Sequence, residues 1–174
     1  CYYYMFRDCS SLTTAPELPA TTLANYSYRA MFQGCTHLTT APELPATTLA
    51  DYCYQSVFRG CTSLTSAPEL PATTLATNCY EGMFYGCTSL ETPPALPSTT
   101  LAEGCYSEMF SNCSAMKLST TPTAEYTKPY RIPTTGTGVD ATMAMANMFV
   151  ATGGTFTGTP AINNTYYLWN PVPY

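Results

Sequence analysis

The sequence repeats itself every 26 residues over more than half of its length. Met-Phe, or Val-Phe once, is followed after two residues by Cys, and this pattern starts at Met5, Met31, Val57, Met83 and Met109. A fixed period of ~20–50 residues is typical of proteins built from stacked units, in which each unit packs mainly against its neighbours. The repeat therefore predicts an elongated stack of similar coils rather than one compact core.

The apolar residues within each repeat predict a helix. In the fourth repeat we expect it over 74–86, because Leu75, Cys79, Met83 and Cys87 follow one another at intervals of four residues. A second apolar row lies beside the first, and two such rows form one wide apolar stripe on a helix.

The residues at both ends of this segment favour helix termini. A threonine hydroxyl can accept a free backbone N–H at the start of a helix, and the positions concerned are Thr22, Thr48, Thr74 and Thr100. Gly, Asn and Asp tolerate the left-handed conformation that often follows a helix, and the corresponding column is Asp8, Gly34, Gly60, Gly86 and Asn112. A short strand is expected over 64–67, ending where Pro68 and Pro71 lack N–H donors.

The repeat resembles a known family. Its Met-Phe-x-x-Cys-x-x-Leu core is similar to the BspA-type leucine-rich repeats of surface proteins from gut and oral Bacteroidetes. The phrase Ala-Pro-Glu-Leu-Pro-Ala-Thr-Thr-Leu-Ala strengthens the resemblance, which covers roughly 1–118, and the segments 154–157 and 169–171 resemble the ends of such arrays. The resemblance implies an α/β fold: a right-handed leucine-rich-repeat solenoid with one short parallel strand and one helix per repeat and a C-terminal cap. It also implies an adhesin or another host- or matrix-binding surface protein.

Three parts of the chain are predicted. Residues 1–116 contain about 4.5 repeat units, 117–136 form an insertion loop rich in Thr, Pro and Tyr, and 137–174 form a last helix, over 139–149, and a capping region. A cap is expected because the exposed end of a stack would otherwise associate; a ligand-binding appendage is the alternative. The chain starts inside a repeat without an initiator Met, which predicts a fragment whose targeting segment lies upstream.

Composition excludes several classes of partner. Charged residues make up 10% of the chain, the net charge is −5, and only six residues are Lys or Arg. A basic patch for nucleic acid or for an anionic membrane surface is therefore not expected. No apolar run approaches the ~18 residues of a membrane span, so no direct membrane insertion is predicted.

The cysteines form two columns with a period of 26 residues: Cys1, Ser27, Cys53, Cys79 and Cys105, and Cys9, Cys35, Cys61, Cys87 and Cys113. Two cysteines of one predicted helix are eight residues apart, or ~12 Å, which is too far for a disulfide. The odd count of nine and the serine in one column favour buried free thiols. Disulfides between adjacent repeats and metal binding are the alternatives.

No catalytic, cofactor-binding or metal-binding residues are predicted. His37 is the only histidine, and a pairing with Cys35 would place the nucleophile in a buried structural column. Glu17, Glu43 and Glu69 form a carboxylate column, expected as a solvated rim, with a weak calcium site as the alternative.

The positions that vary most between repeats fall on the predicted helix face opposite the apolar stripe. They are either simply solvent-exposed or a diversified binding surface, for which the candidates are Tyr3, Arg7, Arg29, Gln33, Gln55, Arg59, Glu81 and Tyr85. With the family resemblance, they predict a non-enzymatic cell-surface or secreted recognition and adhesion module that binds a protein or glycan. The alternatives are a structural spacer, or a phage or prophage receptor-binding or tail-associated protein with the same repeats.

Overall fold

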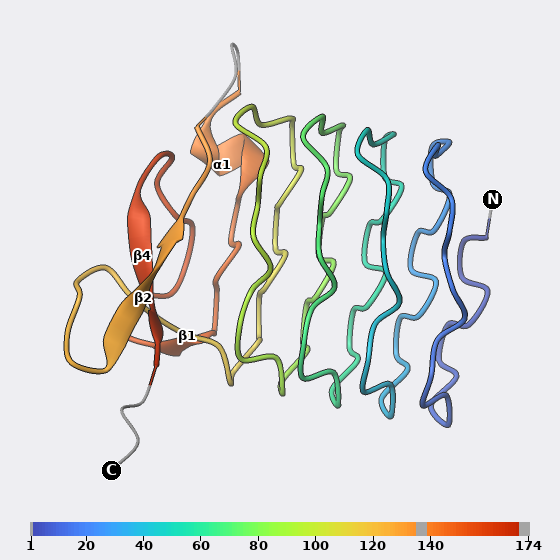
Figure 1. The fold of residues 1–174 in the computed structure, drawn as a ribbon, viewed down its shortest axis with the longest axis horizontal. Coiled ribbons are helices and arrows are strands. Elements are labelled where there is room, and N and C mark those ends of the chain that lie inside the picture. The colour runs from blue at the N-terminus through green and yellow to red at the C-terminus, as the bar shows by residue number, and fades with distance from the viewer. Residues whose placement is uncertain (1, 135–138, 171–174) are drawn as a thin grey trace.

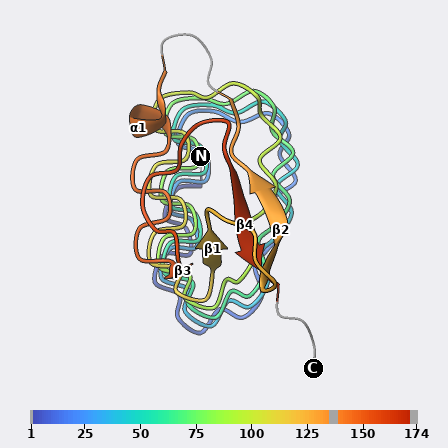
Figure 2. The ribbon, with the colours of Figure 1, turned by 90° about the vertical axis from the view of Figure 1, so that its left-hand side faces the viewer.

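The computed structural model describes residues 2–134 and 139–170. The chain forms an elongated stack of coils, with the N-terminal coil at one end and the strands at the other (Figure 1). Seen along the stack, successive coils lie over one another as similar ovals (Figure 2). A ladder of stacked rings marks six coils: Phe6, Phe32, Phe58, Phe84, Phe110 and Phe149. Cys1, Pro171 and the predicted boundary between loop and cap at 135–138 lie outside the described residues.

Each coil contains a segment that we call the turn ribbon: residues 2–9, 26–35, 52–61, 78–87, 104–113 and 143–152. Its backbone N–H groups alternate between two directions. The N–H of Tyr80 donates to the carbonyl of Cys105 in the next coil at 3.0 Å, whereas the N–H of Met83 donates to the carbonyl of Tyr80 in its own coil at 3.1 Å. Every fourth residue has a positive φ, for example Asn78 at 51° and Gly82 at 57°. The ribbon is therefore a run of overlapping four-residue turns, hydrogen-bonded to the neighbouring coils.

The predicted helix over 74–86 is wrong. In the turn ribbon, two adjacent residues in every four are buried. Cys79 and Tyr80 form one such pair and Met83 and Phe84 the next, and all four are at most 1% exposed. A helix with two neighbouring apolar rows has the same pattern of apolar residues. The pattern alone therefore does not distinguish a helix from a turn ribbon. Direct backbone hydrogen bonds between the coils also bring them closer than the ~8–10 Å at which helices pack.

The two predicted end columns have different outcomes. The column from Asp8 to Asn112 is left-handed in all five coils, with φ between 58° and 77°, as the sequence predicts. The threonine column does not cap helices. Thr48 instead forms an isolated parallel bridge with Thr74 in the next coil.

The predicted fold class is also wrong. Where the strand over 64–67 was expected, the coils are joined by single parallel bridges, from Thr14 to Thr40 and from Thr40 to Ser66. The repeats therefore contain neither the strand nor the helix of the predicted leucine-rich-repeat solenoid. The prolines that follow these bridges withhold the N–H groups that a longer ladder would need.

Regular strands and the one helix of the described residues lie in the C-terminal part of the chain. The strands are β1 (Lys117–Ser119), β2 (Tyr126–Arg131), β3 (Gly153–Gly154) and β4 (Thr165–Trp169). They form a sheet in the order β2-β4-β1-β3, in which only β1 and β3 are parallel. β2 and β4 cross the end of the stack (Figure 2).

These elements correct two further predictions. The segment 117–136, predicted as a loop, contains β1 and β2. The helix predicted over 139–149 is reduced to α1 (Ala141–Ala144), whose start is capped by the Asp140 carboxylate accepting the N–H of Met143 at 3.0 Å. After α1 the chain forms a sixth turn ribbon, in which Met148 and Phe149 are fully buried.

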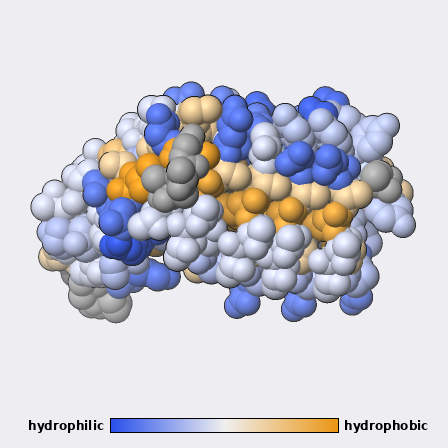
Figure 3. All heavy atoms as spheres, turned by 90° about the horizontal axis from the view of Figure 1, so that it is seen from above, coloured by the Kyte–Doolittle hydropathy of each residue, from blue (hydrophilic) through white to orange (hydrophobic). Residues whose placement is uncertain are grey.

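Columns of identical or similar side chains form one continuous core. Ring centroids in the phenylalanine ladder are 5.6–5.8 Å apart, and Tyr28, Tyr54, Tyr80 and Tyr106 form a parallel ladder at 5.8–5.9 Å. Seen from the side that carries α1, hydrophobic residues also form a band along the stack (Figure 3). The stacked columns hold the coils in register, because each ring packs on its equivalent one period away.

Candidate binding surface

The outer face of the turn ribbon carries all eight candidate binding residues. Tyr3 and Arg7, in the first coil, are exposed, and the other six are half-buried. We define the outer face as these residues together with Tyr4, Tyr26, Tyr52, Asn78 and Glu108, which contact them. Its side chains fall into two groups along the stack.

The first group is a cluster of tyrosine and arginine in the first three coils. The guanidinium of Arg29 lies 5.9 Å from the ring centre of Tyr4 and 5.7 Å from that of Tyr26. Tyr26 stacks on Tyr52 with centroids 4.8 Å apart and ring planes 6° from parallel. Cations over aromatic faces are attracted by the ring quadrupole, so the rings and Arg29 hold one another in place.

A hollow of about 360 Å³ opens inside this cluster, lined by Tyr3, Tyr4, Asn25, Tyr26 and Arg29. Tyr3 is 58% exposed and Tyr26 is 40% exposed, so their rings remain accessible. Arg7 contributes from one side, with its guanidinium 5.2 Å from the ring of Tyr4. This end of the outer face therefore combines aromatic surface with two cations.

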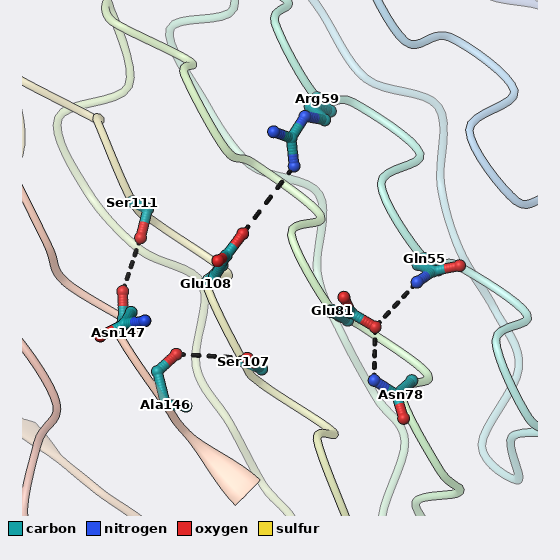
Figure 4. A network of polar contacts seen from close by, with 9 residues as sticks. All are labelled: Gln55, Arg59, Asn78, Glu81, Ser107, Glu108, Ser111, Ala146 and Asn147. Carbon is teal, nitrogen blue, oxygen red and sulfur yellow. Dashed lines mark hydrogen bonds and ion pairs between the residues drawn. The ribbon is translucent and has the colours of Figure 1, made fainter. Parts of the chain in front are cut away.

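The second group is a polar network across the later coils (Figure 4). Gln55 Nε2 donates to Glu81 Oε2 at 2.7 Å, and the amide of Asn78 donates to the same oxygen. The Arg59 guanidinium lies 3.7 Å from the ring centre of Tyr85. These side chains interact mainly with one another across adjacent coils. This part of the outer face therefore links the coils and leaves few polar groups available to a ligand.

The same network continues toward the C-terminal end. Arg59 Nη1 lies 3.9 Å from Glu108 Oε2, and the Ser107 hydroxyl donates to the carbonyl of Ala146 at 3.3 Å. Among the described residues, no side-chain hydrogen bond or ion pair involves Gln33. The structure thus brings Gln55 and Glu81 together, and Arg59 and Tyr85, but shows no side-chain hydrogen bond or ion pair between Gln33 and the described residues of either group.

Sequence reasoning missed Tyr26, Tyr52 and Asn78. They occupy the column that directly precedes the first cysteine column. Two tyrosines exactly one period apart were the available signal, because equivalent residues of adjacent coils come into contact in a stack.

The thiols have a structural role. All eight described cysteines are free, as the sequence predicts, and only Cys9 is exposed. The Cys35 thiol donates to the carbonyl of Phe6 in the preceding coil at 3.0 Å, and the thiol of Cys61 donates to that of Phe32 at 3.2 Å. Burial raises the pKa of Cys35 to about 11 and that of Cys61 to about 12, which disfavours the nucleophilic thiolate.

The remaining titratable candidates lie at the surface. His37 is exposed, and its Nδ1 lies 2.6 Å from the carbonyl of Ser10, to which it donates. Glu17, Glu43 and Glu69 are exposed. The described residues include no group of three or more His, Cys, Asp or Glu side chains placed to hold a metal ion.

Within the same residues, no helix has the length and hydrophobicity needed to cross a membrane. Comparison with protein-family models, with curated proteins and with solved structures finds no match to this chain. The resemblance to BspA-type repeats therefore rests on the sequence phrases alone and stays a prediction.

Proposed function

We propose that the protein is a non-enzymatic recognition module, displayed at a cell surface or secreted, that binds a protein or a glycan through the outer face of the turn ribbon. The tyrosine and arginine cluster around the 360 Å³ hollow supports this proposal most directly. It is the part of the outer face where large side chains remain exposed.

The chemistry of the cluster suits such ligands. Tyrosine and arginine are enriched where proteins bind one another, because each offers a large contact area with a polar group at its end. A tyrosine ring also provides a flat apolar face for a sugar ring, while Arg29 and Arg7 provide hydrogen-bond donors for hydroxyl or carboxylate groups. The ring of Tyr26 is fixed in position because it stacks on the ring of Tyr52 in the next coil.

The alternative is a structural spacer. Continuous ladders of phenylalanine and tyrosine through the stack favour a stiff rod, and a rod needs no ligand. The two functions differ in whether the isolated chain binds anything.

A binding screen followed by matched variants tests the proposal. The chain is applied to glycan arrays and to host-surface and matrix proteins, and the affinity of each positive ligand is measured for Arg29→Ala and Tyr3→Ala. We expect each variant to weaken binding by at least about tenfold, since both residues line the hollow. Arg131→Ala, an exposed arginine on β2, is the control and should bind as the unmodified chain does. Arrays without a signal at high protein concentration would favour the spacer.

A further inference from the structure

Adjacent coils are joined unevenly around their circumference. The turn ribbons exchange backbone hydrogen bonds along their whole length, and a parallel bridge joins Thr40 to Ser66. Beyond this bridge each coil continues into a segment with two prolines, and no hydrogen bond between described residues joins 42–46 to 68–72. Proline has no N–H to donate, so these segments lie beside one another without a ladder.

Two hollows open between these segments. One, of about 360 Å³, lies between the second and third coils and is lined in part by Pro45 and Pro68. The other, of about 410 Å³, lies between the third and fourth coils and is lined in part by Pro71 and Pro94. Pro68, Glu69 and Pro71 line both hollows. The hollows therefore form one groove across three coils, which we call the proline groove.

The proline groove is separate from the outer face of the turn ribbon. α1 and β3, which flank the sixth turn ribbon, lie on one long side of the oval, and β2 lies on the other (Figure 2). The hydroxyl of Tyr130, in β2, donates to the carbonyl of Pro94 at 3.1 Å, which places the proline segments on the β2 side. The three coils that form the groove each have a neighbouring coil on both sides.

The lining of the groove combines apolar surface with carboxylates. All of its residues are Pro, Ala, Leu or Glu, so its ionised side chains accept hydrogen bonds and donate none. Glu43 and Glu69 are exposed. Within the described part of the chain, neither carboxylate forms a hydrogen bond or an ion pair.

The cations of the chain lie elsewhere. Three are in turn ribbons and three are in β1 and β2: Arg7, Arg29, Arg59, Lys117, Lys128 and Arg131. The carboxylates of adjacent coils therefore repel one another without a cation of the repeat between them. The equivalent position in the fourth coil is Ala95, so the groove is acidic at one end and apolar at the other.

We propose that the proline groove binds an extended basic segment of a partner protein, with a Lys or Arg side chain against Glu43 and Glu69 and apolar side chains between the prolines. Strands joined by parallel bridges lie ~4.8 Å apart, so one cationic group can reach the carboxylates of two adjacent coils. Nucleic acids and anionic lipids carry the same sign of charge as the groove and are repelled. The proposal does not depend on what the outer face binds.

The experiment measures the binding of two labelled peptides by fluorescence anisotropy at low salt. The probe repeats Lys-Leu-Pro over about twelve residues, because an extended polyproline II segment has about three residues per turn and so carries its lysines on one side. The reference peptide repeats Lys-Gly-Ser and has the same charge without the apolar side chains. We expect the chain to bind the probe at least about tenfold more tightly than the reference, because only the probe fills the spaces between the prolines.

Matched variants locate the binding site. Glu43→Gln combined with Glu69→Gln should weaken binding of the probe by at least about fivefold, because both carboxylates face the cation. Glu103→Gln combined with Glu125→Gln changes the net charge equally at two exposed positions outside the groove and should change the affinity less than about twofold. Melting curves check that both pairs are folded.

A gain of affinity is expected when the acidic column is extended. Ala95→Glu places a further carboxylate in the groove and should tighten binding of the probe by about two- to threefold, whereas Thr88→Glu, at an exposed position outside the groove, should not. Absence of binding, equal affinity for the two peptides, or equal losses in the two glutamine pairs would overturn the proposal. So would sedimentation of the chain as a dimer that Glu43→Gln with Glu69→Gln dissociates, because that result assigns the groove to a second copy.

Discussion

The two ends of the stack contain equivalent columns of residues in opposite states. Met148 and Phe149 are fully buried in the last coil, whereas Met5 is exposed and Phe6 half-buried in the first. At the C-terminal end the sheet, Phe156 and Tyr130 cover Phe149, with the latter two rings meeting it edge-on at 6.2 and 6.4 Å. At the N-terminal end, no described residue covers Phe6 in the same way.

This difference shows which parts of the chain bury the core residues. Repeated residues satisfy one another wherever a coil has neighbours on both sides, so identical sequence is enough in the interior. A coil at the end has the same residues but half of the contacts. Burial there depends on residues outside the repeat, such as those of β2 and β4, and the predictions below compare equivalent positions to measure that dependence.

The largest difference is expected for a charge placed in the methionine column. Met83→Asp puts an unpaired carboxylate at a fully buried position and should lower the free energy of unfolding by about 3–5 kcal/mol. Met5→Asp, at an exposed position of the same column, should change it by less than about 0.5 kcal/mol, because the side chain reaches water. Urea unfolding of both variants provides the measurement, and equal losses would contradict the exposure of Met5 in the first coil.

A smaller difference is expected for the phenylalanine ladder. Phe149→Ala removes a fully buried ring under the C-terminal sheet and should cost about 3–5 kcal/mol, whereas Phe6→Ala removes a half-buried ring and should cost about 1 kcal/mol. Phe84→Ala, in the interior, serves as the reference for a ring stacked on both sides. A Phe149→Ala variant as stable as Phe6→Ala would show that the sheet does not stabilise the last coil.

Much of this arrangement could be predicted from sequence, because it follows from the period alone. The exact 26-residue spacing predicts that equivalent residues stack, and the ladders are observed accordingly. The free thiols were predicted from the odd count of nine and from Ser27 and are also observed, although the distance along a helix that supported the same prediction does not apply. The outer face also follows, since residues between two buried pairs must point away from the core. What the period cannot give is the backbone path within one coil.

The helix was predicted because its apolar pattern and that of the turn ribbon coincide. Asn78, Gly82 and Gly86 lie four residues apart, and all three have positive φ. Asn and Gly tolerate this conformation, so their spacing is a sequence signal for the turn ribbon. The third coil obscures it, because Tyr52 and Ser56 adopt φ of 57° and 56° without being glycine. Left-handed conformations of such residues are rare and are held by the hydrogen bonds between coils.

The position of the candidate binding surface was predictable, but its side-chain contacts were not. Variation between repeats locates residues such as Arg29 and Glu81 on the outer face. It does not show that Glu81 is occupied by Gln55 and Asn78 while Arg29 borders an open hollow, because those contacts depend on side-chain geometry across adjacent coils.

The buried thiols should make the free energy of unfolding fall at high pH, and the contribution of a single cysteine can be measured. Burial raises the pKa of Cys61 to about 12 from an ordinary value of 9.0. The unfolded chain therefore loses this proton first, and stability that is complete below pH 9 falls between pH 9 and 12. One such thiol should contribute about 1.4 kcal/mol per pH unit in that window.

Cys61→Ala isolates this contribution. Under reducing conditions its free energy of unfolding should fall less steeply above pH 9 than that of the unmodified chain, by about that amount. The variant also loses packing at neutral pH, so the slopes are compared rather than the absolute values. Parallel slopes would mean that the Cys61 thiol titrates alike in the folded and unfolded chains.

The smallest effect concerns two buried tyrosine hydroxyls, one in the stack and one in the covering sheet. The Tyr80 hydroxyl is buried and has no hydrogen-bond partner among the residues that the structure describes, whereas the Tyr130 hydroxyl donates to the carbonyl of Pro94 at 3.1 Å. Removing an unpaired buried hydroxyl relieves a desolvation cost, so Tyr80→Phe should raise the free energy of unfolding by up to about 1 kcal/mol. Tyr130→Phe should lower it by about 1 kcal/mol, because it leaves the Pro94 carbonyl unpaired. Thermal and urea unfolding of the pair measure both signs, and a loss at Tyr80 equal to that at Tyr130 would show that the stack satisfies its hydroxyls as well as the sheet does.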